Sequence, residues 1–158
     1  MIQLENPGSK IVSQARTWLG TKYHHQGRLK KSSTCSGGVD CIGLIIGIIN
    51  ELNICDDQGY ILSKYDRVDY SNSPQSAKLA ETMALYLLPI DYKDMQIGDI
   101  LLFKFCKEPQ HVGIVSDYSS QGLGLIHCHR SSGYVIEQPL SNTWIRMITH
   151  IYRFRNFL

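Results

Sequence analysis

The sequence predicts an α+β fold in which N-terminal helices, one of them deeply buried, pack on a C-terminal antiparallel sheet. Hydrophobic residues recur at helical spacing in the first half of the chain and at every second position after about residue 96. Helices followed by a run of strands are typical of α+β proteins. The chain has 158 residues, of which 43% are hydrophobic, so we expect a single domain over residues 1–158 with one hydrophobic core.

Three segments of the first half have helical spacing: residues 9–19, 40–52 and 76–88. The segment 40–52 is apolar on nearly every side, which predicts a helix buried in the middle of the domain. Within it, Gly43 and Gly47 would form a flat stripe on which another element packs closely. We expect the third helix to end at Pro89.

Two polar stretches separate these helices. Residues 21–38 are rich in Lys, Ser, Thr and Gly and predict a long loop, and long loops in compact domains are often functional. Residues 53–75 are also polar and contain possible short elements around 60–70.

The second half predicts a meander of strands. Alternating hydrophobic residues mark four of them, at 97–105, 111–118, 123–129 and 133–138. The turns at 119–122 and 130–132 are short and contain Ser and Gly, as tight connections between antiparallel strands do. A last strand, at about 145–154, would close the sheet.

Composition argues against several classes of function. The net charge is only +2 and the basic residues are scattered, so no nucleic-acid-binding surface is indicated. The most apolar run, residues 42–49, is too short to span a bilayer, so we expect no membrane insertion. Residues 1–10 do not form a secretory signal peptide, which indicates synthesis in the cytoplasm. The five cysteines show no disulfide framework and fit a reducing compartment.

Cys41 is the first candidate for chemistry. Asp40 is a good N-cap and would place Cys41 in the first turn of the buried helix, where the helix dipole is positive. A cysteine there has its thiolate favoured if a cationic imidazole also lies nearby. Gly37 and Gly38 precede Cys41, in a loop suited to close backbone approach. The alternative is that Cys41 is a small buried apolar residue.

Three histidines can supply the other half of a cysteine-dependent site. His111 begins a predicted strand and is the candidate general base. His127 and His129 point to the same face of a later strand, so either could reach the ring of His111 across the hairpin and fix its orientation. Spacing alone does not choose between them.

Metal binding is the competing explanation for this group. His24, His25, His127, Cys128 and His129 are common zinc-ligand types. However, no pair has the short fixed spacing of zinc sites, and adjacent residues such as His24 and His25 face opposite ways in an extended segment. We therefore expect neither a metal nor another cofactor.

Five motifs in order resemble the NlpC family of cell-wall peptidases, and most closely its short phage-tail branch. The similarity runs from about Ala15 to the C-terminal strand. The motifs are Gly20-Thr21-Lys22-Tyr23, Val39-Asp40-Cys41-Ile42-Gly43-Leu44, Gly98-Asp99-Ile100-Leu101, His111-Val112-Gly113-Ile114 and Ile126-His127.

The resemblance implies a reduced papain-like fold with a cysteine-dependent site. It implies Cys41 as nucleophile, His111 as base and His127 as the residue that orients the base. It places Tyr23, whose hydroxyl would lie near the reacting centre, and Asp40 in the substrate-binding and oxyanion region. The implied substrate is the stem peptide of peptidoglycan, often cut between D-glutamate and the diamino acid.

The sequence departs from the family pattern at positions that would face the substrate. Lys22 replaces the usual proline before the tyrosine, Gln26-Gly27 replaces the usual pair of glycines after it, and Ile42 replaces a small residue after the cysteine. These departures leave the cleaved bond open.

The expected function is therefore a cysteine endopeptidase of peptidoglycan, acting at the cell wall and possibly carried there by phage-tail-like structural proteins. A papain-like acyltransferase or amidase with another substrate is one alternative. A catalytically silent wall-binding or assembly module is another. A silent module should leave Cys41 no more reactive toward thiol reagents than Cys55 or Cys106.

Overall fold

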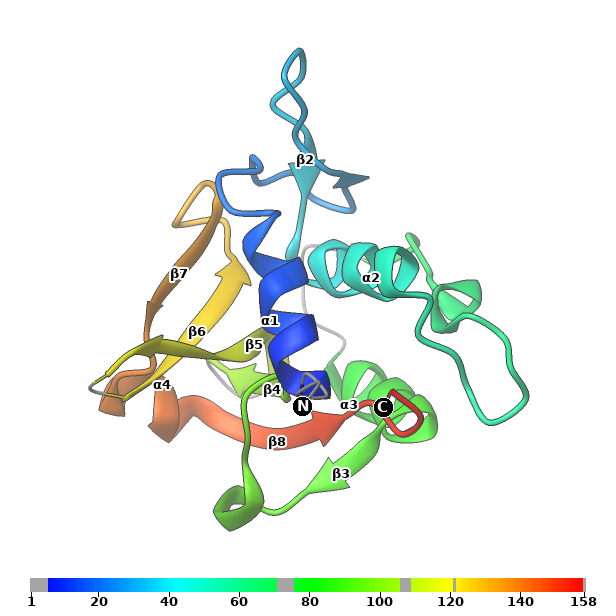
Figure 1. The fold of residues 1–158 in the computed structure, drawn as a ribbon, viewed down its shortest axis with the longest axis vertical. Helices are drawn as coiled ribbons and strands as arrows, with labels where there is room; N and C mark the ends of the chain where they lie inside the picture. Colours follow the sequence, from blue (N-terminus) through cyan, green and yellow to red (C-terminus); the bar gives the residue numbers. More distant parts are fainter. Residues whose placement is uncertain (1–5, 71–75, 106–108, 121, 158) are drawn as a thin grey trace, which may run out of the picture.

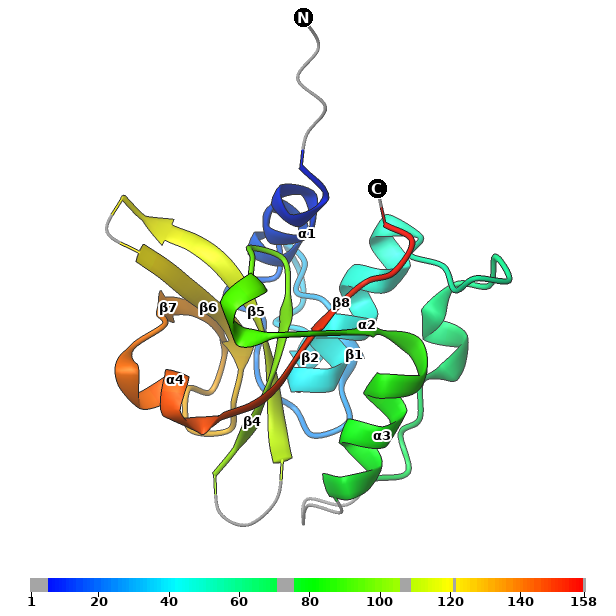
Figure 2. The same cartoon turned by 90° about the horizontal axis from the view of Figure 1, so that it is seen from below.

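The computed structural model describes residues 6–70, 76–105, 109–120 and 122–157, so Cys106 and Gln121 lie outside the described part. Its centre is an antiparallel sheet of six strands in the order β3-β8-β4-β5-β6-β7 (Figures 1 and 2). The strands are β3 (Leu88–Ile90), β4 (Ile100–Lys104), β5 (Pro109–Ser119), β6 (Gly122–Cys128), β7 (Val135–Pro139) and β8 (Ile148–Arg153). The four predicted consecutive strands are confirmed as β4 to β7.

Helices cover both faces of this sheet. The helices α1 (Pro7–Arg16), α2 (Cys41–Leu52) and α3 (Ser76–Tyr86) pack on one face and share the larger hydrophobic core with β4, β5, β6 and β8. The short helix α4 (Asn142–Met147) packs on the other face over a smaller core that includes Phe103 and Leu125. The arrangement confirms the predicted α+β class.

The helix α2 lies at the centre of the larger core, as predicted. Asp40 caps its N-terminus, with the carboxylate Oδ1 accepting a hydrogen bond from the backbone N–H of Gly43 at 2.8 Å. The glycine stripe is also confirmed. A side chain at Gly47 would collide with the indole of Trp18, and one at Gly43 with the carbonyl oxygen of Gly27. The stripe therefore lets two other segments approach α2 at backbone distance.

The prediction of a single C-terminal strand that closes the sheet was wrong both in where the strand begins and in where it lies. The segment predicted as one strand at 145–154 begins with α4, because Trp144 and Ile145 pack on the second face of the sheet. The strand β8 then runs between β3 and β4 in the interior of the sheet. The strand β3 was not predicted because Pro89 indicated only a helix end, but proline is tolerated on an edge strand.

The two polar stretches contain short elements. The loop 21–38 carries the hairpin β1 (Arg28–Leu29) and β2 (Gly38–Val39), and the chain between these strands projects from the body of the molecule at the top of Figure 1. A 3-10 helix, η1 (Leu62–Tyr65), lies in the second stretch, and another, η2 (Tyr92–Asp94), precedes β4.

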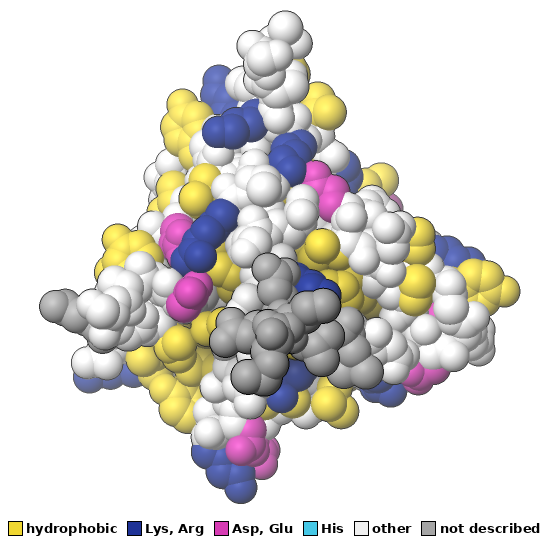
Figure 3. Space-filling view, in the orientation of Figure 1, with side chains coloured by type: hydrophobic (Ala, Val, Ile, Leu, Met, Phe, Trp, Pro, Cys, Tyr) yellow, Lys and Arg dark blue, Asp and Glu magenta, His cyan; other side chains and the backbone are white. Residues whose placement is uncertain are grey.

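Charged side chains are dispersed on the face shown in Figure 3, where Lys and Arg alternate with polar and hydrophobic groups. Among the described residues, no helix has the length and apolar character needed to cross a bilayer.

Candidate active site

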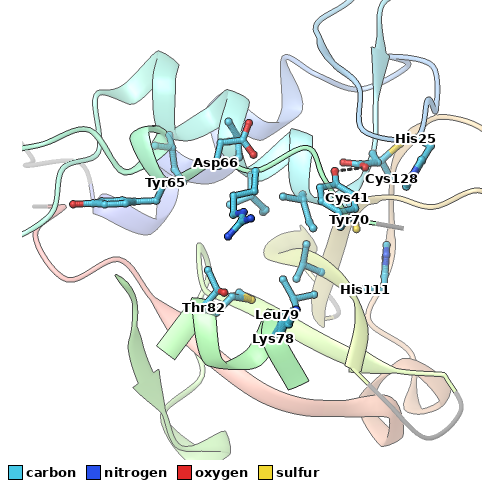
Figure 4. A pocket seen from close by; sticks show the side chains of 18 of the residues that line it. His25, Cys41, Tyr65, Asp66, Tyr70, Lys78, Leu79, Thr82, His111 and Cys128 are labelled. Atoms are coloured by element: carbon cyan, nitrogen blue, oxygen red, sulfur yellow. Dashed lines mark hydrogen bonds between the residues drawn. The ribbon is translucent and has the colours of Figure 1, made fainter. Parts of the chain in front are cut away.

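A pocket of about 610 Å³ opens beside the N-terminus of α2 (Figure 4). One side, which we call the catalytic wall, is formed by Cys41, His111, Val112 and His129. Residues 66–70, which we call the tethered segment, line the pocket together with side chains of α3. The pocket thus contains the predicted nucleophile and base together.

Cys41 is the first residue of α2, as predicted, and it keeps part of its surface open. Its surroundings nevertheless oppose the expected thiolate. Burial and the adjacent Asp40 carboxylate raise the pKa of the Cys41 thiol from 9.0 to about 12, while nearby backbone amides, of which that of Val112 has the largest effect, lower it less. The condition for the expected thiolate, a cationic imidazole beside Cys41, is not met in the free chain, and desolvation outweighs the helix dipole.

His111 and His127 form a buried pair behind Cys41. Each is 2% exposed, and His111 Nε2 lies 2.7 Å from His127 Nδ1. Burial lowers the pKa of His111 well below 6.5, and His127 and His129 lower it further. Burial, followed by the influence of His129, lowers the pKa of His127 to about 4. Both rings are therefore neutral near pH 7.

The hydrogen bond between the two rings is compatible with a tautomer of His111 that suits a general base. If His111 Nε2–H donates to His127 Nδ1, then His111 Nδ1 carries the lone pair that a general base needs. His127 then holds its proton on Nε2, a buried atom with no hydrogen-bond partner among the described residues. The structure thus brings together the residues that the resemblance implied as base and orienting residue.

Aromatic side chains enclose this histidine pair. Trp144 of α4 packs edge-to-face against His127 with ring centroids 4.9 Å apart, and its ring also lies 6.0 Å from that of His111. Phe105 stacks on His111 at 5.5 Å. Sequence reasoning missed Trp144, since this residue fell between the strands predicted at 133–138 and 145–154 and was assigned to no element.

His129 takes a different position from His127. Its ring lies 5.1 Å from that of His111, but no hydrogen bond joins the two within the described residues. Its Nδ1 is instead held by Ser131, whose Oγ lies 2.6 Å away and whose backbone N–H lies at 3.2 Å. His129 lines the pocket, whereas His127 is behind the wall.

Asp40 organises the side of the pocket opposite the histidines. Beyond capping α2, it accepts hydrogen bonds from the backbone N–H of Gln26 at 2.8 Å and the hydroxyl of Tyr70 at 2.5 Å. Arg28 lies 3.3 Å from Asp40 and makes two 2.8 Å bonds to the Asp66 carboxylate. These contacts hold the tethered segment in place. A role for Asp40 in the oxyanion region stays a prediction.

Tyr23 lines the pocket beside Cys41. Burial raises the pKa of its hydroxyl, with smaller contributions from Asp40 and Cys41, so the group is protonated near neutral pH and can donate a hydrogen bond. Its predicted position near the reacting centre agrees with this geometry, and its role in substrate binding stays a prediction.

The residues considered as metal ligands do not gather into one site. His24 contacts the backbone of its neighbour, while the ring of His25 packs against Tyr70. Within the described ranges, no group of three or more His, Cys, Asp or Glu side chains is arranged to hold a metal ion.

Solved structures with a similar fold include NlpC/P60 proteins and an amidase. An NlpC/P60 family protein from Bacillus cereus ATCC 10987 matches 93% of this chain and 40% of its own length with a TM-score of 0.60 and 20% identity. An N-acetylmuramoyl-L-alanine amidase from Bacteroides uniformis ATCC 8492 matches 95% of this chain and 99% of its own with a TM-score of 0.57 and 15% identity. The NlpC/p60 domain of the peptidoglycan hydrolase SagA matches 92% and 97% with a TM-score of 0.53 and 18% identity.

The chain spans less than half the length of the Bacillus cereus protein and nearly all of the other two. No protein-family model matches the sequence, and no curated protein does. The predicted resemblance to the NlpC family and the papain-like α+β fold are confirmed at the level of the fold, and the resemblance to the phage-tail branch stays a prediction.

Proposed function

We propose that this chain is a cysteine hydrolase of amide bonds in peptidoglycan, with Cys41 as nucleophile, His111 as base and His127 as the residue that orients it. One observation carries the proposal: Cys41 begins a buried helix at a pocket whose same wall holds His111, backed by its 2.7 Å bond to His127. The amidase and the SagA domain, which share the fold, act on peptidoglycan by name and support this substrate class.

The free site holds a neutral thiol and a neutral imidazole, so the thiol loses its proton only during its attack on the substrate. His111 Nδ1 takes the thiol proton as the Cys41 sulfur bonds to the amide carbonyl carbon. Backbone N–H groups at the start of α2 are suited to stabilise the resulting oxyanion, because helix-start amides lack helical partners. His127 accepts from His111 Nε2–H and thereby supports the imidazolium that forms.

The intermediate then collapses with transfer of the proton from His111 to the leaving amine, which leaves a thioester on Cys41. Water next attacks this thioester while His111 accepts a proton from the water. The proton returns to the sulfur as the thiol leaves, and the new carboxylic acid departs. The proposed bond is that between D-glutamate and the diamino acid of the stem peptide, and the proposed place of action is the cell wall, reached with phage-tail-like partners.

The test is mass spectrometry of purified stem peptides incubated with wild type, Cys41→Ala and the control Cys35→Ala, which removes an exposed thiol on the β1–β2 loop. New free amines and carboxylates should appear with wild type and Cys35→Ala alone, and the masses identify the bond. Products from Cys41→Ala would contradict the assignment. Consumption without a net gain of free amine would indicate acyl transfer instead.

The raised pKa of the Cys41 thiol is the one observation that favours a silent assembly module. It also means that thiol labelling does not distinguish the hydrolase from the silent module. An enzyme of this design also has a protonated thiol when free, so slow thiol labelling at neutral pH fits both. Turnover of stem peptides separates them, and its absence in a folded wild-type protein would favour the silent module.

A further inference from the structure

The turn after β6 presents polar groups to the pocket that the proposed mechanism does not use. His129 and Arg130 line the pocket on the side of Cys41, and Tyr23 lines it nearby. None of the three takes part in the proton transfers between Cys41 and His111. Arg130 can only donate hydrogen bonds, and the neutral ring of His129 and the hydroxyl of Tyr23 can each donate one, so together they suit an anionic ligand.

The backbone holds this turn in a fixed position. The carbonyl oxygen of His129 accepts from the backbone N–H groups of Ser132 and Gly133, each at 3.1 Å, and Ser132 Oγ lies 2.7 Å from the same oxygen. The backbone N–H of Tyr23 donates to the carbonyl of Gly133 at 2.8 Å, which ties the turn to the loop before α2. Arg130 is therefore carried on a rigid support and not on a free loop.

The proton of His129 can be placed from its contacts with Ser131. The backbone N–H of Ser131 can only donate, so His129 Nδ1 at 3.2 Å accepts and carries no proton. Burial lowers the pKa of His129, which keeps the ring neutral. The single ring proton then lies on Nε2, on the other edge of the ring, where no described residue accepts it.

Arg130 differs from the other arginines near the pocket. Arg28 is paired with Asp66 and Arg67 with Asp69, whereas no ion pair within the described ranges includes Arg130. Arg130 is exposed and lies close enough to Tyr23 to lower the pKa of that hydroxyl. Its charge is thus directed at the pocket without an internal counter-ion from the described residues.

We propose that Arg130, the Nε2–H of His129 and the hydroxyl of Tyr23 form a subsite for a substrate carboxylate next to the scissile amide. This inference rests on the proposed hydrolase and identifies a feature of its substrate. A guanidinium binds a carboxylate through two parallel hydrogen bonds, and neutral donors add direction. A γ-linked glutamyl residue has a free α-carboxylate in the same residue as its scissile carbonyl. The subsite therefore selects this group over the corresponding α-amide.

The test compares two synthetic stem peptides that differ only in an α-carboxylate or an α-carboxamide on the γ-linked glutamyl residue. Cleavage by wild type and Arg130→Gln gives kcat/KM for each peptide. Arg146→Gln is the control, because it removes another exposed positive charge, on α4 and outside the pocket. Binding of both peptides to Cys41→Ala, with and without Arg130→Gln, is measured by calorimetry. Arg130→Lys tests whether charge alone suffices.

Wild type and Arg146→Gln should prefer the carboxylate by about tenfold or more, the size expected for a hydrogen bond to a charged group, and Arg130→Gln should lose that preference. Arg130→Lys should restore part of it. Equal cleavage and equal binding of the two peptides by proteins that carry Arg130, or a preference that survives Arg130→Gln, overturns the subsite. Selective binding to Cys41→Ala without cleavage by wild type supports the subsite and contradicts the hydrolase.

Discussion

The catalytic wall and the tethered segment differ in what holds them. The catalytic wall takes its geometry from regular structure, since Cys41 is placed by the start of α2 and His111 by a strand of the central sheet. The tethered segment has no regular structure and is held by Arg28, which reaches across 38 residues to Asp66. Chemistry is thus built on the rigid part of the fold, and the shape of the pocket depends on charged long-range contacts.

The two regions also differ in how they treat charge. At the catalytic wall, His111 in the wall and His127 behind it are buried as neutral rings among aromatic groups. Around the tethered segment, charged side chains form ion pairs, with Arg28 between Asp40 and Asp66. Acidification should therefore damage the first region, whereas loss of one charged partner should damage the second.

The largest effect is expected from His111→Gln, which removes the base but keeps a polar side chain of similar size. The kcat/KM for stem peptides should fall by about 10² to 10⁴, the usual contribution of general acid–base catalysis. Thermal unfolding followed by circular dichroism should show that the variant is folded. The control is His24→Gln, an exposed histidine that does not line the pocket. Equal activity of the two variants would remove His111 from the mechanism.

The second effect is a dependence of stability on pH that comes from the buried histidines. The folded-state pKa of His127 is about 4 against 6.5 when unconstrained, so between these values the unfolded chain binds more protons than the folded chain. The unfolding free energy is therefore highest above pH 6.5, and it decreases as pH falls toward 4. A shift of that size corresponds to on the order of 3 kcal/mol.

Urea unfolding at several pH values between 4 and 7 measures this dependence. His127→Gln should make the slope of the unfolding free energy against pH less steep, since one of the two buried histidines is gone and His111 remains. An unchanged slope in this variant would mean that His127 titrates normally in the folded protein.

The third effect tests the tethered segment with two neighbouring arginines. Arg28→Ala leaves Asp66 and Asp40 without their partner, and we expect a loss of about 2 kcal/mol of unfolding free energy, in the range for hydrogen bonds to charged groups. Arg67→Ala breaks an ion pair with Asp69 whose side chains are 76% and 65% exposed, so about 0.5 kcal/mol or less is expected.

In Arg28→Ala, KM should rise more than kcat falls, because the tethered segment lines the pocket but holds no reacting group. Hydrogen exchange should show faster exchange of residues 66–70 in this variant and not in Arg67→Ala. Equal stability losses in the two variants would mean that Arg28 does not hold the segment.

The contrast also explains what the sequence could predict. The helix α2, its capping Asp40 and the β5–β6 hairpin come from local patterns, so Cys41 and His111 can be identified from the sequence alone. The pairing of Arg28 with Asp66 cannot, because nothing in either segment marks the other as its partner. The raised thiol pKa of Cys41 could not be predicted for a similar reason: the helix position is local, but desolvation depends on the whole fold.

The choice between His127 and His129 is a second case that the spacing of residues in the sequence could not decide. Both lie on one strand face by alternation, and both rings lie about equally far from that of His111, at 5.0 and 5.1 Å. What separates them is the turn after β6, where Ser131 takes the Nδ1 of His129. The resemblance pointed to His127, and the hydrogen bond between His111 and His127 agrees with it.

The smallest effect should come from Trp144→Leu, which keeps an apolar side chain but removes the ring that covers His127. An aromatic pair contributes about 0.5 to 1.5 kcal/mol, so kcat/KM near pH 7 should fall less than tenfold. With less burial, the pKa of His127 moves up toward 6.5, and the acid limb of the pH–rate profile moves to higher pH. Trp144→Phe keeps a ring and should retain the wild-type profile. If Trp144→Leu loses activity but keeps the acid limb of wild type, then Trp144 only fills space, and the low pKa of His127 is set by the sheet alone.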